Sequence, residues 1–237
     1  MRRVIHSVIL DQRGCGAGLP YARQVFHGGR SDDILATVEE IHRWSPTSPL
    51  SLIGVSLGGN MILKMLGELG ESTPPMLERA LALSPPVDMQ RCASLIDQKS
   101  NRFYNRFFVK GLQRQWIQRG LLFPDQPRPR FFRGMTIRDF DSMITAPLNG
   151  FQSVDDYYSR IGSESLLRHI RLPTLIITSR DDPFITSEPF ESADLPEDVK
   201  VLLLKFGGHL GFLGPDGQGG YRWAERRVID WALASED

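Results

Sequence analysis

One short turn restricts the local structure of this chain more than any other segment: Gly54-Val55-Ser56-Leu57-Gly58, between an apolar run and a helix-like stretch. The apolar run, Leu50 to Val55, is typical of a buried strand, and Met61 to Leu69 has the pattern of a helix. Glycines flank the serine in a Gly-x-Ser-x-Gly turn because a Cβ on either neighbour would clash with the chain. The pattern therefore predicts a strained strand-to-helix turn that projects the Ser56 hydroxyl at the carboxyl end of a strand.

Strand-like and helix-like segments alternate along most of the chain. The expected strands are Val4 to Leu10, Leu50 to Val55, Ala80 to Leu83, Leu172 to Thr178 and Val199 to Leu204; the expected helices are Ser31 to Trp44, Met61 to Leu69 and Tyr221 to Leu233. This alternation predicts an α/β fold with a mostly parallel sheet and helices on both faces. No strand pattern is found from Met89 to about Arg168. We therefore expect a single domain over residues 1–237 with a helical cap inserted at about residues 89–168.

A serine on such a turn needs a base and a group that orients the base, and these follow it in the order acid, then histidine. Asp181 and Asp182 come directly after one expected strand, and His209 lies in a glycine-rich loop after the next. The carboxyl ends of parallel strands meet at one edge of the sheet, where active sites lie. The sequence thus predicts Ser56 as nucleophile, His209 as base and Asp182 as acid, with Asp181 as the alternative acid.

Each of these motifs also has a simpler explanation. The Gly-x-Ser-x-Gly segment can be only a tight turn, the acidic pair a solvated helix start, and His209 a loop histidine bonded to backbone. The combination of three sites in the right order, each after an expected strand, favours the catalytic interpretation. The other histidines and Cys15 lack this context, and we interpret all of them as structural residues. These histidines are His6, His27, His42 and His169.

Composition excludes several other classes of protein. The formal net charge is zero, which argues against a chain held to nucleic acid by bulk electrostatics. The two cysteines, Cys15 and Cys92, have neither metal-ligand spacing nor the number for a disulfide framework, so we expect no metal and a reducing, cytoplasmic location. No run approaches the roughly 18 apolar residues that a membrane-spanning helix needs. The expected chemistry requires no organic cofactor.

Motifs over nearly the whole chain resemble the YheT-like branch of the α/β-hydrolases, a family of predicted carboxylesterases and abhydrolase-domain lipases. The stretches that carry the resemblance are Arg13-Gly14-Cys15-Gly16, His27 to Asp33, Gly54 to Asn60, Phe140-Asp141 with Thr145-Ala146-Pro147, Gly150-Phe151 with Asp156-Tyr157-Tyr158, Asp181 to Phe184 and Gly207 to Phe212. The resemblance implies an α/β-hydrolase fold in which Ser56, Asp182 and His209 carry the nucleophile, acid and base. It implies hydrolysis or transfer of acyl esters, and it specifies the reaction class better than the ligand.

The chain departs from that family at its amino terminus. Members carry further strands and a His-Gly loop before the stretch that resembles Val4 to Gly18, so we expect an amino-terminally truncated domain. That loop normally gives the second backbone donor to the oxyanion hole, and the first is the N–H of Leu57. A missing donor lowers turnover by about 10² to 10³. The absent strand would lie between Val4–Leu10 and Leu50–Val55, so either these two pair directly or the chain is a fragment.

The expected cap is basic and aromatic. Between Met89 and Arg138 there are eleven Lys or Arg and two Asp, interleaved with eight aromatic residues. Such a segment is compatible with a lid over an acyl pocket, weak contact with a membrane surface, or a nucleic-acid surface. We slightly favour a solvated cap whose aromatics pack inward and whose arginines pair with acids. Among functional roles we prefer the lid, and no nucleic-acid motif accompanies the charge.

Two hypotheses of different class follow. The first is a serine esterase or lipase-like hydrolase of carboxylic esters that works through an acyl-enzyme on a small-molecule ester or lipid, with acyl transfer to an alcohol as a variant. The second is a catalytically weak or inactive remnant of the hydrolase fold.

Overall fold

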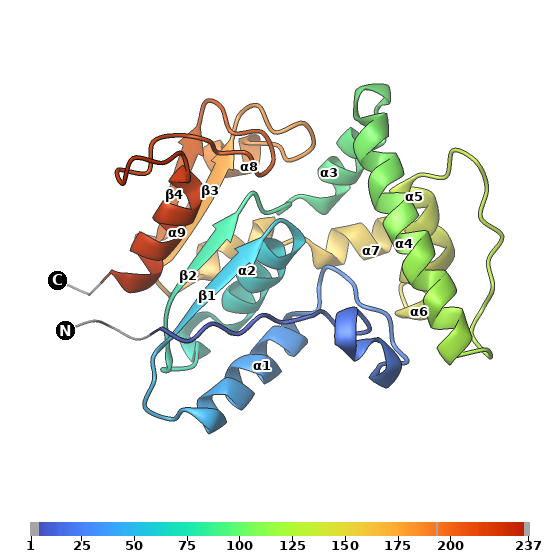
Figure 1. The fold of residues 1–237 in the computed structure, drawn as a ribbon, viewed down its shortest axis with the longest axis horizontal. Helices are drawn as coiled ribbons and strands as arrows, with labels where there is room; N and C mark the ends of the chain where they lie inside the picture. Colours follow the sequence, from blue (N-terminus) through green and yellow to red (C-terminus); the bar gives the residue numbers. More distant parts are fainter. Residues whose placement is uncertain (1–4, 193, 235–237) are drawn as a thin grey trace.

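A computed structural model describes residues 5–192 and 194–234 of the chain, built around a parallel sheet (Figure 1). The strands are β1 (Leu50–Val55), β2 (Leu77–Leu83), β3 (Thr174–Ser179) and β4 (Val199–Leu204), and their spatial order is the same as their sequence order. Every neighbouring pair runs parallel. The parallel sheet is as predicted, and the strands agree with the predicted ones to within three residues at each end.

Helices cover both faces of this sheet, as predicted. On one face lie α1 (Ser31–Trp44) and α2 (Leu57–Leu69), and on the other lies α9 (Trp223–Leu233). Neighbouring residues of a strand point to opposite faces. Ala80 and Ile176 accordingly pack in the cluster that contains α2, whereas Leu81 and Ile177 pack in the cluster that contains Ala224 of α9.

The amino-terminal segment does not form the strand that its sequence predicts. A strand was predicted from Val4 to Leu10; Val4 lies outside the described residues, and residues 5–10 form no strand and are exposed, Ile9 to 92%. A strand is defined by hydrogen bonds to a neighbour, and in the described part of the chain the sheet's own pairings join β1 only to β2. Apolar, β-branched composition alone was therefore a misleading signal here. A 3₁₀ turn, Gly16–Tyr21, follows.

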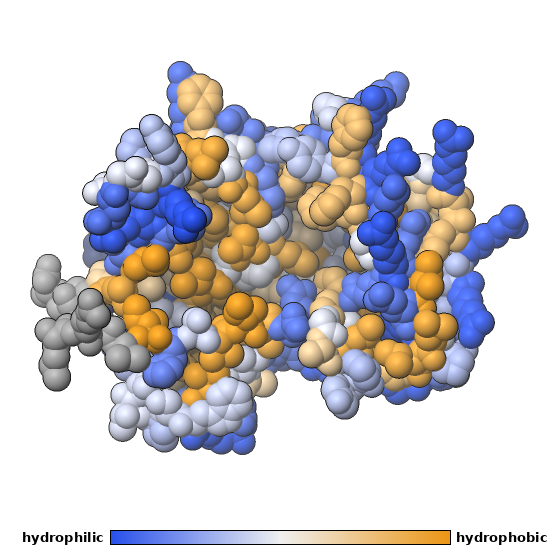
Figure 2. Space-filling model, viewed as in Figure 1, coloured by the Kyte–Doolittle hydropathy of each residue, from blue (hydrophilic) through white to orange (hydrophobic). Residues whose placement is uncertain are grey.

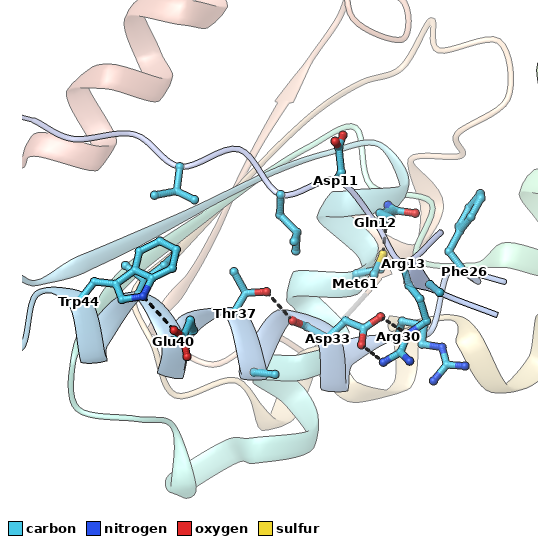
Figure 3. Close-up of a pocket in the computed structure, with 15 residues that line it drawn as sticks. Asp11, Gln12, Arg13, Phe26, Arg30, Asp33, Thr37, Glu40, Trp44 and Met61 are labelled. Carbon is cyan, nitrogen blue, oxygen red and sulfur yellow. Dashed lines mark hydrogen bonds and ion pairs between the residues drawn. The ribbon is translucent and has the colours of Figure 1, made fainter. Parts of the chain in front are cut away.

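A cavity of about 410 Å³ lies beneath this amino-terminal segment, against α1 (Figure 3). Arg13 forms an ion pair with Asp33 at one end, and the indole of Trp44 donates a hydrogen bond to Glu40 at the other. Ser56, His209 and Asp182 are not part of its wall. Apolar side chains gather on this face of the molecule around the sheet (Figure 2).

Only helices and loops occupy the chain between β2 and β3, which agrees with the absence of a strand pattern there. The helices are α3 (Met89–Ile96), α4 (Arg102–Leu122), α5 (Ile137–Phe140), α6 (Ala146–Leu148) and α7 (Val154–Ile161), with a π-helix at Asp141–Thr145. The π-helix and α6 continue directly from α5. Figure 1 shows α4 at the far end of the molecule from the sheet, with α3 and α7 between them. We call residues 89–168 the cap.

The aromatic residues of the cap divide between the interior and the surface. Trp116, Phe123 and Phe140 are buried, whereas Phe103 and Phe107 on α4 are exposed. The expectation that the cap aromatics pack inward is therefore only partly correct. Hydrophilic side chains project from the same end of the molecule (Figure 2). The remaining helix, α8 (Glu188–Ser192), is a short one that follows β3.

Candidate active site

The turn between β1 and α2 has the predicted strained geometry, but the predicted steric need for both glycines is correct only for Gly54, because a Cβ on Gly58 would meet nothing within 4 Å. Ser56 has a positive φ of 51°, a conformation that L-residues rarely adopt. A Cβ on Gly54 would lie 2.6 Å from the carbonyl oxygen of Gly58, so only glycine allows the strand and the helix to approach this closely. The backbone N–H of Ser56 donates to the carbonyl of Leu83 at 2.8 Å, which ties the turn to the end of β2.

The side chains of Ser56, His209 and Asp182 form one hydrogen-bonded chain. The Nε2 atom of His209 lies 2.9 Å from the Oγ of Ser56, and its Nδ1 lies 2.8 Å from Oδ2 of Asp182. The Asp182 side chain is fully buried, and that of His209 is 12% exposed. With Nδ1 donating to the carboxylate, Nε2 is left as an acceptor for the serine hydroxyl proton. Ser56 lies 153 positions before His209 in the sequence and Asp182 lies 27 positions before it, yet the three side chains meet in the folded chain.

The structure separates the roles of the two neighbouring aspartates. Oδ1 of Asp182 accepts hydrogen bonds from the backbone N–H groups of Phe184 and Ile185, at 3.1 and 3.0 Å, so its other oxygen is directed at His209. Asp181 is exposed, and its Oδ1 accepts from the N–H of Gly208 at 2.8 Å. This bond lowers the pKa of Asp181. Asp181 therefore contacts the backbone of the histidine loop and not the imidazole.

Two serines that the sequence analysis did not select hold the histidine loop in place. Ser84, which follows β2, donates from its Oγ to the carbonyl of His209 at 2.5 Å, and Ser179 of β3 donates to the carbonyl of Gly208 at 2.7 Å. The ring of Phe184 packs on the imidazole with a centroid distance of 4.4 Å. The only sequence signal for the serines is their position at the carboxyl ends of strands, which many serines share.

The first turn of α2 lies beside Ser56, and among the described residues its backbone N–H groups before Asn60 have no backbone acceptor. Within this turn the first backbone bond runs from the N–H of Asn60 to the carbonyl of Ser56. The first N–H groups of any α-helix have no acceptor within the helix, and the N–H of Leu57 is one of these groups. Asn60 is fully buried, and its side-chain amide donates to the carbonyls of Gly28 and Ile161 at 3.0 and 2.9 Å. It thereby fastens the start of α2 to the amino-terminal loop and to α7.

A cavity of about 760 Å³ opens beside Ser56 and Leu57. Most of its wall comes from the cap and is apolar, including Phe107, Phe108, Trp116, Ile137 and Ile144. This volume is within the range of small-molecule sites, and the wall is of the kind that binds an apolar ligand. The cap therefore encloses space directly next to the serine.

Burial shifts the pKa values of several ionisable groups in or near the cavity wall. Asp141, in the π-helix, accepts a hydrogen bond from the hydroxyl of Tyr158 at 2.8 Å, and burial raises its pKa from 3.8 to about 6. Burial also raises the pKa of the Cys92 thiol to about 12, which makes it a poor nucleophile. Burial lowers the pKa of His27 to about 4, so this histidine is neutral at pH 7.

Within the described part of the chain, the thiols and the remaining His, Asp and Glu side chains do not assemble into a second reactive centre. Cys15 and Cys92 are both free thiols, and the Cys15 sulfur accepts a hydrogen bond from the Gln115 amide at 3.0 Å. In residues 5–192 and 194–234, no cluster of three or more His, Cys, Asp or Glu side chains has the geometry to hold a metal ion. Among the same residues, no helix has the length and apolar composition to span a lipid bilayer.

Comparison with known sequences gives a consistent family assignment. Residues 1–218 match the alpha/beta hydrolase family. The chain is 28% identical over 229 residues to "Putative esterase YheT" of Escherichia coli (strain K12), which covers 95% of this chain and 67% of that protein. It is also 28% identical over 210 residues to phospholipase ABHD3 of Mus musculus, covering 87% of this chain and 51% of that protein. The chain thus spans between about half and two thirds of the length of these relatives.

Comparison with solved structures supports the same fold. The crystal structure of 2,6-dihydroxy-pseudo-oxynicotine hydrolase superposes with a TM-score of 0.56 at 16% sequence identity, over 94% of this chain and 50% of that chain. At this identity the likeness concerns the fold alone. It agrees with the parallel sheet and flanking helices described above.

Proposed function

This chain belongs to the alpha/beta hydrolase family, as the resemblance predicted, and we propose that it is a serine hydrolase of carboxylic esters that acts through Ser56, His209 and Asp182. The observation that carries the proposal is the unbroken chain of hydrogen bonds from Asp182 through His209 to Ser56 at the wall of the large cavity. Esterase-like relatives support the reaction class. The assignment of the three roles is our inference.

In the first half of the reaction, Oγ of Ser56 attacks the ester carbonyl while Nε2 of His209 takes the hydroxyl proton. Asp182 keeps the proton on Nδ1 and stabilises the imidazolium that forms. The backbone N–H of Leu57, at the start of α2, donates to the oxyanion of the tetrahedral intermediate. The intermediate then collapses, His209 returns its proton to the departing alcohol oxygen, and the acyl group stays on Ser56.

In the second half, His209 takes a proton from a water molecule as that water attacks the acyl-enzyme. The second tetrahedral intermediate releases the carboxylic acid, and the proton on His209 returns to Oγ of Ser56. The apolar wall that the cap provides is suited to the acyl portion of the ester. We therefore propose a small-molecule acyl ester or a lipid as substrate.

The direct test is covalent labelling of the folded protein with a fluorophosphonate probe, which reacts with activated serines. We expect labelling of the wild type and none of Ser56→Ala. The matched control is Ser94→Ala, on the exposed surface of α3, which should label like the wild type. Absence of labelling of the native wild type would contradict the proposal, as would labelling that persists in Ser56→Ala.

A further inference from the structure

Arg119 is an unusual residue for the wall of an apolar cavity, because its guanidinium is almost completely buried. The residue lies on α4, lines the cavity that contains Ser56, and is 2% exposed. Its Nε donates to the side chain of Gln126 at 2.8 Å, and its Nη2 donates to the backbone carbonyl of Arg23. Its Nη1 is buried and has no hydrogen-bond partner among residues 5–192 and 194–234. Both N–H groups of this nitrogen are therefore left unused, which is costly in a buried cation unless something else accepts from them.

Among the described residues, no carboxylate forms an ion pair with this cation. Both acceptors of Arg119 are neutral oxygens, and in the described part of the chain it takes part in no ion pair. Burial lowers the pKa of Arg119, and the charge of Arg23 acts in the same direction. A guanidinium nevertheless remains protonated in proteins. The folded chain therefore holds a positive charge in a desolvated place without an opposite charge.

The backbone of Gly14 lies close to Nη1 of Arg119. Gly14 has a φ of +69°, and a Cβ there would lie 2.9 Å from Nη1 of Arg119. Gly14 also lines the cavity, and its carbonyl accepts from the Gln115 side chain at 3.0 Å. A side chain at Gly14 would therefore crowd Nη1, which is already buried.

Two further cations lie on the same stretch of α4. Lys110 and Arg114 line the cavity and form no ion pair in the described part of the chain. Among the described residues, the cavity wall contains one carboxylic acid, Asp141, which already accepts from Tyr158 and Thr145. The charges that act on the pKa of Arg119 do not include that of Asp141, so the two do not form a pair. The α4 side of the cavity is therefore electrostatically positive.

We propose that the α4 side of the cavity is an anion subsite, in which Nη1 of Arg119 binds a carboxylate or phosphate group carried by the substrate. Lys110 and Arg114 add attraction without buried contacts. This inference rests on the proposed function, because it takes the ligand to be the ester substrate. It restricts the substrate to esters that carry a carboxylate or phosphate group in addition to the reacting carbonyl. Such a group supplies the missing acceptor and the missing negative charge together.

The first experiment measures binding without hydrolysis. Octyl phosphate and octan-1-ol share an alkyl chain and contain no acyl ester, so calorimetry on the wild type reports the contribution of the charge alone. We expect octyl phosphate to bind about tenfold more tightly or better, and this preference to be lost in Arg119→Met. Equal binding of the two compounds, or a preference that persists in Arg119→Met, would overturn the proposal. Equally tight binding of inorganic phosphate and octyl phosphate would also overturn the proposal, because the site would then bind a free ion and not a group carried by the substrate.

The second experiment measures selectivity for esters. The mono-4-nitrophenyl ester of octanedioic acid carries a terminal carboxylate, and 4-nitrophenyl octanoate is its neutral counterpart. We expect Arg119→Met to lower the ratio of the two kcat/KM values about tenfold and Arg119→Lys to restore part of it. A proportional loss on both esters would indicate a structural role and overturn the proposal.

If Arg119→Met does not fold, the exposed pair Lys110→Gln with Arg114→Gln replaces it. This double variant should lower the same ratio by a smaller factor, and an unchanged ratio would count against the subsite. The two proposals remain distinguishable. Binding of octyl phosphate through Arg119 in a protein that hydrolyses no ester would leave the subsite standing and refute the esterase.

Discussion

The sheet and the cap both line the space beside Ser56, but they hold their polar groups in different ways. At the sheet, Asp182 accepts from two backbone N–H groups and His209, and the histidine loop is bonded by Ser84 and Ser179. In the cap, Arg119 keeps an unused donor, and Asp141 is buried with its pKa raised. The sheet thus fixes the positions of a few atoms through its backbone. The cap instead provides a cavity whose charge and shape are left for a ligand to complement.

The largest test of this difference compares the two adjacent aspartates at the end of β3. Asp182→Asn should lower kcat on a neutral ester by about 10⁴-fold, because an amide cannot hold the productive tautomer of His209 or stabilise its charge. Asp181→Asn should lower kcat by less than about tenfold, since Asp181 accepts from the backbone N–H of Gly208 in the histidine loop and not from the imidazole. Steady-state kinetics near pH 7.5 measures both.

A similar loss of kcat in the two variants would contradict the proposed contrast, because the two carboxylates at the end of β3 would then contribute equally to catalysis. Circular dichroism of both variants guards against a trivial loss of folding. Retained activity in Asp182→Asn would contradict the proposed mechanism itself.

The sheet and the cap also differ in how well their structure was predicted from the sequence. β1, α2 and the turn at Ser56 depend on local apolar runs and on Gly54, where a side chain would clash, and both features are visible in the sequence. The order of Asp182 and His209 after successive strands was enough to bring them to one edge of the sheet. Residues 5–10 have the same apolar pattern as a strand, but strand formation depends on a distant neighbour that composition does not reveal.

The cap was the least predictable part because its polar groups depend on contacts far away in sequence. Arg119 was one of eleven basic residues in its segment, and nothing in its sequence neighbourhood marks it as buried against Arg23 and Gly14. Asp141 belonged to a motif of the resembling family, but its burial and its bond to Tyr158 appear only in the folded chain. Sequence patterns predict which face of an element is apolar more readily than which polar group is enclosed.

A pair of glycine substitutions tests whether the sheet tolerates change less than the cap. Gly54→Ala should lower the free energy of unfolding by about 3 kcal/mol or more, because the new Cβ meets the backbone of Gly58. Gly111→Ala, on exposed α4 where an added Cβ meets nothing within 4 Å, should raise it by about 0.5–1 kcal/mol. Urea unfolding measures both changes, and destabilisation of similar size in the two variants would remove the distinction.

The smallest effect concerns the buried carboxyl of the cap and depends on pH. The pKa of Asp141 is about 6 in the folded protein and 3.8 when exposed, so between these values the folded state binds more protons than the unfolded state. Stability from this group is therefore lost as pH rises. The free energy of unfolding of the wild type, minus that of Asp141→Asn, should fall by roughly 1–3 kcal/mol between pH 4 and pH 7.

His27 acts with the opposite sign, because its pKa is lowered to about 4 and protonation below its ordinary value of 6.5 destabilises the folded state. It is present in both proteins, so its contribution cancels in the difference between wild type and Asp141→Asn. The exposed cap residue Asp155 is the control: bonds from Gln90 and Arg138 lower its pKa, so the difference between wild type and Asp155→Asn should not fall over the same range. If the difference in the free energy of unfolding between wild type and Asp141→Asn also stayed constant with pH, burial would not destabilise the charged form of Asp141. The contrast between the cap and the sheet would then depend on Arg119 alone.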